Sequence, residues 1–95
     1  MDFQWDDGNR PKIEERFTSD EIEDALMYGS PVLYRSWEED GENRYRVVAV
    51  HTLGDLLGIV FVLRDGAVRP FSAFYSTSQE EERAWKRRKP KPPLD

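Results

Sequence analysis

Residues 44–76, RYRVVAVHTLGDLLGIVFVLRDGAVRPFSAFYS, decide the fold. Alternation and β-branched residues predict three strands in this run, which span 44–52, 55–65 and 67–76. The middle one is apolar on both faces, which predicts the central strand of a sheet. The pair Asp65-Gly66 predicts a tight hairpin. Pro70 lacks an N–H, so we expect the last strand to lie at an edge or to leave that position unbonded.

Working outward toward the N-terminus, residues 31–39 predict a fourth strand, with Val32, Tyr34 and Ser36 on one face. Residues 2–5 alternate aromatic and polar side chains, which favours a short edge strand.

Two helices are expected between these strands. Thr18 and Glu21 form a capping box that predicts a helix over 19–28. Pro11 suits the first turn of a short helix through residue 16, because the missing N–H breaks no bond there.

Toward the C-terminus, Ser78 and Glu81 predict a second capping box and a final helix. The proline- and lysine-rich residues 89–95 are expected to be a disordered tail, which leaves one domain over 1–88. The element order β-α-α-β-β-β-β-α predicts an α+β protein. We expect an antiparallel meander with two N-terminal helices and one C-terminal helix.

Composition narrows the functional classes. The 95 residues include no cysteine and one histidine, so we expect no disulfide, no metal site and no cofactor. The longest apolar run, 56–63, is far below the roughly 20 residues of a membrane helix. The acidic N-terminus lacks the apolar core of a signal peptide. These features predict a soluble, cytoplasmic protein without membrane association.

The net charge of -5 is unevenly distributed. Residues 1–43 hold 13 acidic and 4 basic side chains, whereas residues 44–95 hold 6 acidic and 10 basic ones. Overall acidity disfavours non-specific nucleic-acid binding, which depends on phosphate neutralisation. A dipolar surface is still compatible with a basic face for RNA or for an acidic protein.

Over residues 3–85 the sequence resembles the BrnT toxins of bacterial type II toxin–antitoxin pairs. The order and spacing of several short motifs carry the resemblance, at Phe3, Trp5, Asp6, Gly8, Asn9, Lys12, Thr52, Gly54, Arg69, Ser72, Ala73, Glu81 and Arg83. The resemblance implies a RelE-like fold, metal-independent ribonuclease activity and a BrnA-type antitoxin as partner.

RNA cleavage without a metal requires a base, an acid and cations around the reacting phosphate. Three side chains are candidates for this chemistry. His51 is the acid–base candidate, Arg69 the phosphate ligand, and Tyr75 a phosphate donor or base-stacking ring. Each has a structural alternative: a strand histidine bonded to backbone, a salt bridge to Asp55 or Asp65, and a core tyrosine. Further candidate RNA contacts are Lys12, Arg16, Arg46 and Lys86.

The sequence departs from the family pattern at several positions, three of which lack a basic residue. His51, Asp55 and Phe74 replace basic residues that the family usually carries. Losing one such donor typically costs about 100- to 1000-fold in rate. Three readings therefore stay open: an active ribonuclease toxin, a non-cleaving relative that binds RNA or protein, and an interaction module whose resemblance is coincidental.

Overall fold

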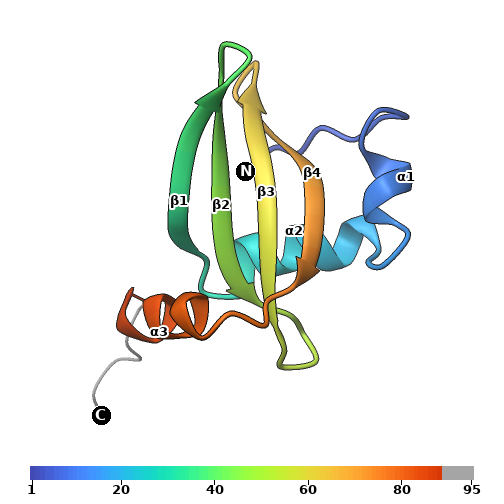
Figure 1. Ribbon diagram of the computed structural model, residues 1–95. Coiled ribbons are helices and arrows are strands. Elements are labelled where there is room, and N and C mark those ends of the chain that lie inside the picture. The colour runs from blue at the N-terminus through green and yellow to red at the C-terminus, as the bar shows by residue number, and fades with distance from the viewer. Residues whose placement is uncertain (89–95) are drawn as a thin grey trace.

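The computed structural model describes residues 1–88, so the expected tail at 89–95 lies outside the described residues. Residues 1–88 form an α+β fold with three helices and one four-stranded sheet (Figure 1). In chain order the elements are α1 (Arg10–Ile13), α2 (Ser19–Tyr28), β1 (Val32–Glu39), β2 (Glu42–Val50), β3 (Leu56–Arg64), β4 (Ala67–Tyr75) and α3 (Gln79–Arg88).

The sheet is the predicted antiparallel meander, with strand order β1-β2-β3-β4. The hairpin at Asp65-Gly66 is confirmed, with positive φ angles of 52° and 78° at its two central residues. Asp40-Gly41 repeats this geometry between β1 and β2, with φ angles of 52° and 79°. Two positive φ angles match the twist of the flanking strands, and glycine adopts them without strain. β4 is an edge strand, as Pro70 predicted.

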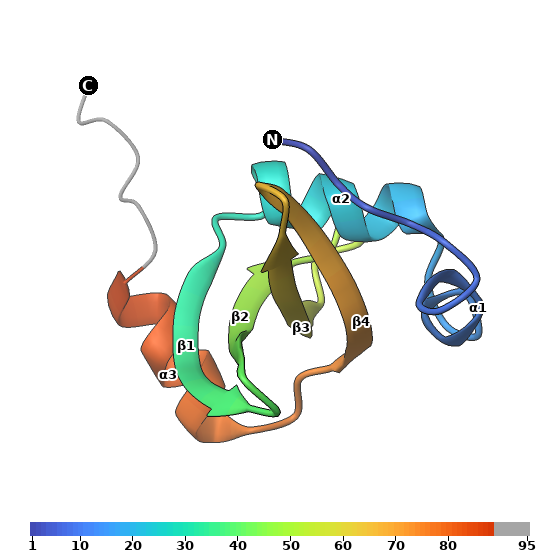
Figure 2. The ribbon, with the colours of Figure 1, turned by 90° about the horizontal axis from the view of Figure 1, so that it is seen from above.

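α2 covers one face of the sheet, and the hydrophobic core lies between them (Figure 2). The core is built from α1, α2, the link between them and the strands β2, β3 and β4. Its buried residues are Ile13, Phe17, Ile22, Ala25, Leu26, Val47, Ala49, Leu57, Ile59 and Val68. The capping box of Thr18 and Glu21 is confirmed at the start of α2. Among residues 1–88 no helix is long and apolar enough to cross a bilayer.

α3 lies against the other side of the sheet, at the end where β1 begins and β2 finishes. Trp85 donates its indole N–H to the Ser30 carbonyl at 3.0 Å, and Arg88 donates to the Leu33 carbonyl at 2.9 Å. The predicted second capping box is half formed, since the Glu81 amide bonds the Ser78 hydroxyl at 3.3 Å. The Glu81 carboxylate binds Arg46 and Ser76 instead of closing the box.

The predicted strand at 2–5 is wrong. Only Phe3 makes an isolated parallel bridge, with Val68 of β4. A buried Asn9 side chain sets the path of this segment, because its amide donates to the carbonyls of Gln4 at 2.9 Å and Pro70 at 2.7 Å. The Asp6 amide donates to the Asn9 side chain at 2.8 Å, so Asn9 occupies the Pro70 carbonyl that a longer ladder with β4 would use.

The alternation predicted for 31–39 is also wrong in part. A bulge between Leu33 and Arg35 pairs Arg35 with Arg46 and Trp37 with Arg44. Those residues therefore face away from α2, on the side where Tyr34 contacts Arg46 and Glu80. We call this side the front face; it includes Tyr34, Arg35, Trp37, Arg44, Arg46, Gly58, Val60, Val62, Arg69, Phe71 and Phe74.

Candidate functional site

His51 is buried beyond the end of β2, with 2% of its surface exposed. The strand predicted over 44–52 is therefore two residues too long at its C-terminal end, since β2 ends at Val50. The Leu53 amide donates to Nδ1 at 3.2 Å, so Nδ1 is unprotonated and Nε2 carries the hydrogen. Nε2 donates to the Glu21 carboxylate. Both ring nitrogens thus have protein partners, and neither faces solvent.

Glu21 holds both His51 and the N-terminus of α2. The hydrogen bond from His51, followed by that from the Thr18 amide, lowers the pKa of Glu21 below its ordinary value of 4.5. A carboxylate with a lowered folded-state pKa contributes stability above its unfolded-state pKa, and this contribution is lost as the pH falls through the folded value.

We therefore expect acid to destabilise the native protein more than a Glu21→Gln variant, in the window that begins near pH 4.5 and extends downward. Urea unfolding of both proteins at neutral pH and at about pH 3 measures this. Equal acid-induced losses in the two proteins would show that Glu21 has no such role. The variant should still lose some stability in acid. Hydrogen bonds from Arg69 and Arg64 also lower the pKa values of Asp6 and Glu42, which the variant retains.

Tyr75 lies near His51 at the same end of the sheet. Phe17 is between them, with ring centroids 6.0 Å from His51 and 5.0 Å from Tyr75 in an edge-on contact. Tyr75 is 49% exposed, so it is not the core tyrosine of the structural alternative. Two of the three predicted catalytic side chains thus flank one phenylalanine.

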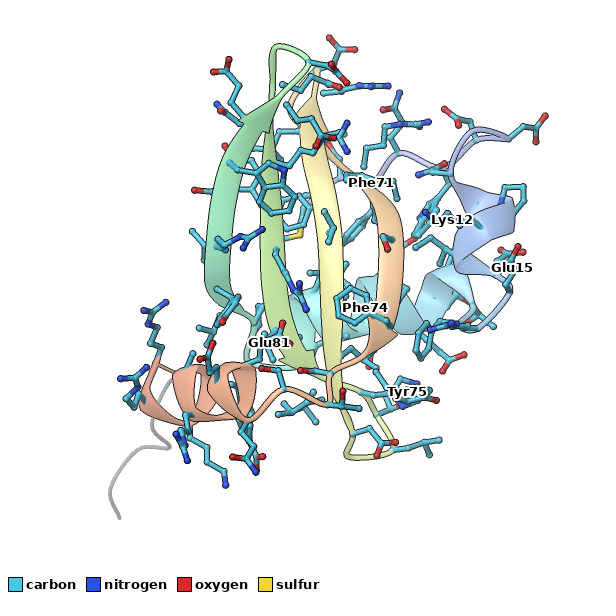
Figure 3. All side chains as sticks on the ribbon, in the orientation of Figure 1. Lys12, Glu15, Phe71, Phe74, Tyr75 and Glu81 are labelled. Carbon is cyan, nitrogen blue, oxygen red and sulfur yellow. The ribbon has the colours of Figure 1, made fainter. Side chains whose placement is uncertain are left out.

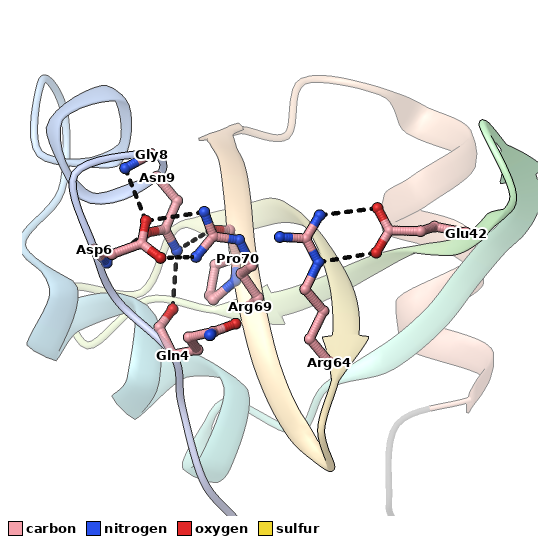
Figure 4. Close-up of polar contacts among 8 residues, drawn as sticks. All are labelled: Gln4, Asp6, Gly8, Asn9, Glu42, Arg64, Arg69 and Pro70. Atoms are coloured by element: carbon pink, nitrogen blue, oxygen red, sulfur yellow. Dashed lines mark hydrogen bonds and ion pairs between the residues drawn. The ribbon is translucent and has the colours of Figure 1, made fainter.

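Arg69 lies elsewhere and is already paired. Its guanidinium donates two hydrogen bonds to Asp6, at 2.6 and 2.9 Å (Figure 4). The same arginine, followed by the Gly8 amide, lowers the pKa of Asp6. A salt bridge was the expected alternative for Arg69, but Asp6 takes the place of Asp55 or Asp65. Figure 4 also shows Arg64 bound by both oxygens of Glu42.

The three predicted catalytic residues therefore do not form one site. Arg69 precedes Tyr75 by six positions along β4, which corresponds to roughly 20 Å of strand. They also belong to opposite faces, because Arg69 pairs with Val62 of the front face and Tyr75 with Leu57 of the core. Among residues 1–88 no group of three histidine, aspartate or glutamate side chains is placed to hold a metal.

The front face instead gathers arginines on aromatic rings. The guanidinium carbon of Arg46 is 4.6 Å from the Phe74 centroid and 5.9 Å from Tyr34. Arg44 lies 4.9 Å from the Phe71 centroid, and Arg35 lies 5.1 Å from Trp37. Four cation–π contacts thus span the sheet from β1 to β4.

A glycine in the central strand makes room for one of these rings. A Cβ placed on Gly58 would lie 2.4 Å from one carbon of the Phe74 ring and 2.6 Å from another. The ring therefore lies directly on the β3 backbone, and Figure 3 shows it on the front of the sheet. Any larger residue at position 58 would lift Phe74 from the face.

Several predicted RNA contacts are engaged within the protein. Arg46 is bound at 2.8 Å to Glu81, whose side chain is 2% exposed. Lys86 pairs with Glu82 of its own helix at 3.0 Å. Arg44, which was not among the predicted RNA contacts, pairs with Glu39 at 2.9 Å. Arg35, by contrast, forms no ion pair within residues 1–88 and is exposed.

Lys12 and Arg16, the two other predicted RNA contacts, are brought together. They line a cavity of about 240 Å³ between the α1 segment and β4, whose other lining residues are Glu15, Ser72, Ala73 and Phe74. Phe74 thus belongs both to this cavity and to the front face.

The sequence reasoning missed the aromatic part of the front face, which includes Trp37 and Phe71. The alternation of arginine around tyrosine in RYR, and the two phenylalanines of PFSAF, were the available signals. Comparisons with protein-family models, with curated proteins and with solved structures gave no match.

Proposed function

We propose that this chain is a divergent BrnT-like protein of RelE-like fold that binds single-stranded RNA on its front face without cleaving it. The observation that carries the proposal is the set of four arginine–aromatic contacts on the sheet face opposite α2, which α3 contacts only at the end near Tyr34 and Arg46. Bases stack on aromatic rings and on guanidinium planes, and they do so with little regard to sequence.

The distribution of charge supports this choice of face. Acidic side chains cluster on α2, behind the sheet, at Asp20, Glu21, Glu23 and Asp24. The front face presents arginines beside their partners Glu39, Glu42 and Glu81, and α3 adds an acidic first turn and a basic last turn of Lys86, Arg87 and Arg88. Arg35, which has no ion pair within residues 1–88, and the last turn of α3 are therefore the parts of this side that attract phosphate, on a molecule whose net charge is -5. Because Arg44 and Arg46 are already paired with carboxylates, few phosphates are neutralised on binding. We therefore expect binding on the order of 10 µM with only a shallow dependence on salt.

We do not propose RNA cleavage, because the predicted general base and the predicted phosphate ligand are not accessible to a substrate. His51 is buried between Glu21 and Leu53, and Arg69 is neutralised by Asp6. A general base must reach the 2′-hydroxyl within hydrogen-bond distance. A buried imidazole with both nitrogens occupied does not offer that reach.

Fluorescence anisotropy with a short labelled single-stranded RNA tests the proposal. We expect Trp37→Ala to weaken binding about tenfold, since loss of a stacking ring typically costs about 1–3 kcal/mol per base. Arg35→Ala should weaken binding less than Trp37→Ala, because it removes one exposed charge and leaves the stacking ring of Trp37 in place. Arg10→Ala removes the same charge from α1, where Arg10 pairs with Glu14 away from the front face, and should leave affinity nearly unchanged.

Equal affinities for the native protein, Trp37→Ala and Arg10→Ala would contradict binding on the front face. A denaturing gel of the same RNA, incubated with protein and a chelator, should show intact RNA.

A ribonuclease toxin with a BrnA-type antitoxin is the second candidate. One observation favours it: His51 and the half-exposed Tyr75 flank Phe17 at one end of the sheet. This candidate predicts RNA fragments in the chelator-treated gel, their loss in His51→Ala, and growth arrest on expression without the partner. Intact RNA and normal growth exclude it.

A further inference from the structure

We infer that the cavity between α1 and β4 binds the terminal phosphate monoester of an RNA strand. The inference rests on the proposed RNA binding and names the group that the protein would recognise at the strand's end. The cavity is lined by Lys12, Glu15 and Arg16 on one side and by Ser72, Ala73 and Phe74 on the other. Figure 3 shows Lys12 and Glu15 beside β4, the strand that carries Phe74.

The two cations of the cavity are available to a ligand. Within residues 1–88 neither Lys12 nor Arg16 forms an ion pair or a side-chain hydrogen bond, and both are exposed. This sets them apart from Arg44, Arg46, Arg64, Arg69 and Lys86, which all pair with carboxylates. Unpaired lysine and arginine with a neighbouring serine hydroxyl provide the donors that a phosphate accepts from.

The charge of the cavity favours a monoester over the diesters inside a strand. Glu15 repels any phosphate, and Lys12 and Arg16 together outweigh it by one charge. A monoester carries about −1.5 to −2 charges at neutral pH, against about −1 for a diester. The two cations therefore gain more from a terminal phosphate than from an internal one.

The size of the cavity points to a group rather than a whole ligand. Its volume of about 240 Å³ lies below the roughly 300–1,000 Å³ of pockets that enclose complete small molecules. A phosphate held there would have its nucleotide emerge over Phe74, which is shared with the front face. The terminal base would then continue the arginine–aromatic stack.

The test uses one short single-stranded RNA with an internal fluorescent label in three forms: both ends hydroxyl, a 5′-phosphate, or a 3′-phosphate. We expect one phosphorylated form to bind about five- to tenfold more tightly than the hydroxyl form, which corresponds to one charge-assisted contact. Lys12→Gln and Arg16→Gln should each remove most of that preference, so that the phosphorylated and hydroxyl forms bind nearly alike.

A gain of affinity provides the sharper check. Glu15→Gln removes the repelling carboxylate, so it should increase the preference for the phosphorylated form. Glu14→Gln is the matched control, because Glu14 pairs with Arg10 and does not line the cavity.

Inorganic phosphate and a nucleoside monophosphate, added as competitors, distinguish a free small phosphate from a strand end. Either one displacing the RNA at micromolar concentration would assign the site to the free ligand and overturn the inference.

Equal binding of all three RNA forms would also overturn the inference, while the proposed function would stand. If no form binds, the proposed function fails as well.

Discussion

Replacing Arg46 by alanine is expected to lower the free energy of unfolding by about 2–3 kcal/mol. Glu81, its partner at 2.8 Å, is 2% exposed, so the variant leaves a buried carboxylate with only the Ser76 hydroxyl as a partner. Breaking a fully buried pair typically costs about 3–5 kcal/mol. We expect less here because the Arg46 side chain is 29% exposed and water screens it. Urea unfolding monitored by circular dichroism measures the change.

Arg44→Ala is the matched control on the neighbouring front-face position. Its partner Glu39 is 52% exposed, so the ion pair should contribute less than about 1 kcal/mol. The double variant Arg46→Ala/Glu81→Ala should recover part of the stability lost in Arg46→Ala, since it removes the stranded carboxylate. Equal losses in Arg44→Ala and Arg46→Ala would mean that Glu81 is not buried as described, and that Arg46 is as available to RNA as Arg44.

Replacing Gly29 by alanine is expected to destabilise the protein by at least about 3 kcal/mol. A Cβ on Gly29 would lie 2.3 Å from the Val50 carbonyl oxygen, 2.6 Å from the Ala25 oxygen and 2.9 Å from the Val50 nitrogen. These are backbone atoms, and the Gly29 carbonyl also accepts a hydrogen bond from the Val50 amide at 2.8 Å. The end of α2 cannot move away from β2 without losing that bond. Thermal unfolding measures the effect.

Gly41→Ala separates this steric clash from backbone strain. Gly41 has a φ of 79°, and a Cβ there meets nothing within 4 Å. Only the left-handed backbone conformation is penalised, at about 1–2 kcal/mol. If Gly29→Ala proves no more harmful than Gly41→Ala, the close contact between α2 and β2 is wrong.

Local signals in the sequence predicted most of the fold. The Asp65-Gly66 hairpin, the Thr18 capping box and the apolar central strand each depend on neighbouring residues, and the structure confirms all three. The failures involve competition from distant partners. Residues 2–5 lose their ladder because Asn9 bonds Gln4 and Pro70, which are 5 and 61 positions away in the sequence.

The arrangement of the site could not be predicted, for the same reason. Two bulges change which side chains share a face of the sheet. One lies in β1 between Leu33 and Arg35, and the other lies in β4 between Pro70 and Ser72. They place Trp37 and Phe71 on the front face. Arg69 finds its carboxylate in Asp6, 63 positions away, and no local pattern indicates that pair. The resemblance to BrnT toxins selected individual residues, but their distribution over two faces appears only in three dimensions.

Mapping of RNA contacts by two-dimensional NMR tests the central claim most directly. On titration with a short single-stranded RNA, we predict that the largest amide and indole shifts come from β1, β2 and β4 around Arg35, Trp37 and Phe71, with α2 nearly silent. Shifts centred on His51 and Tyr75, or no shifts at RNA concentrations well above 10 µM, the order expected for this binding, would contradict the account.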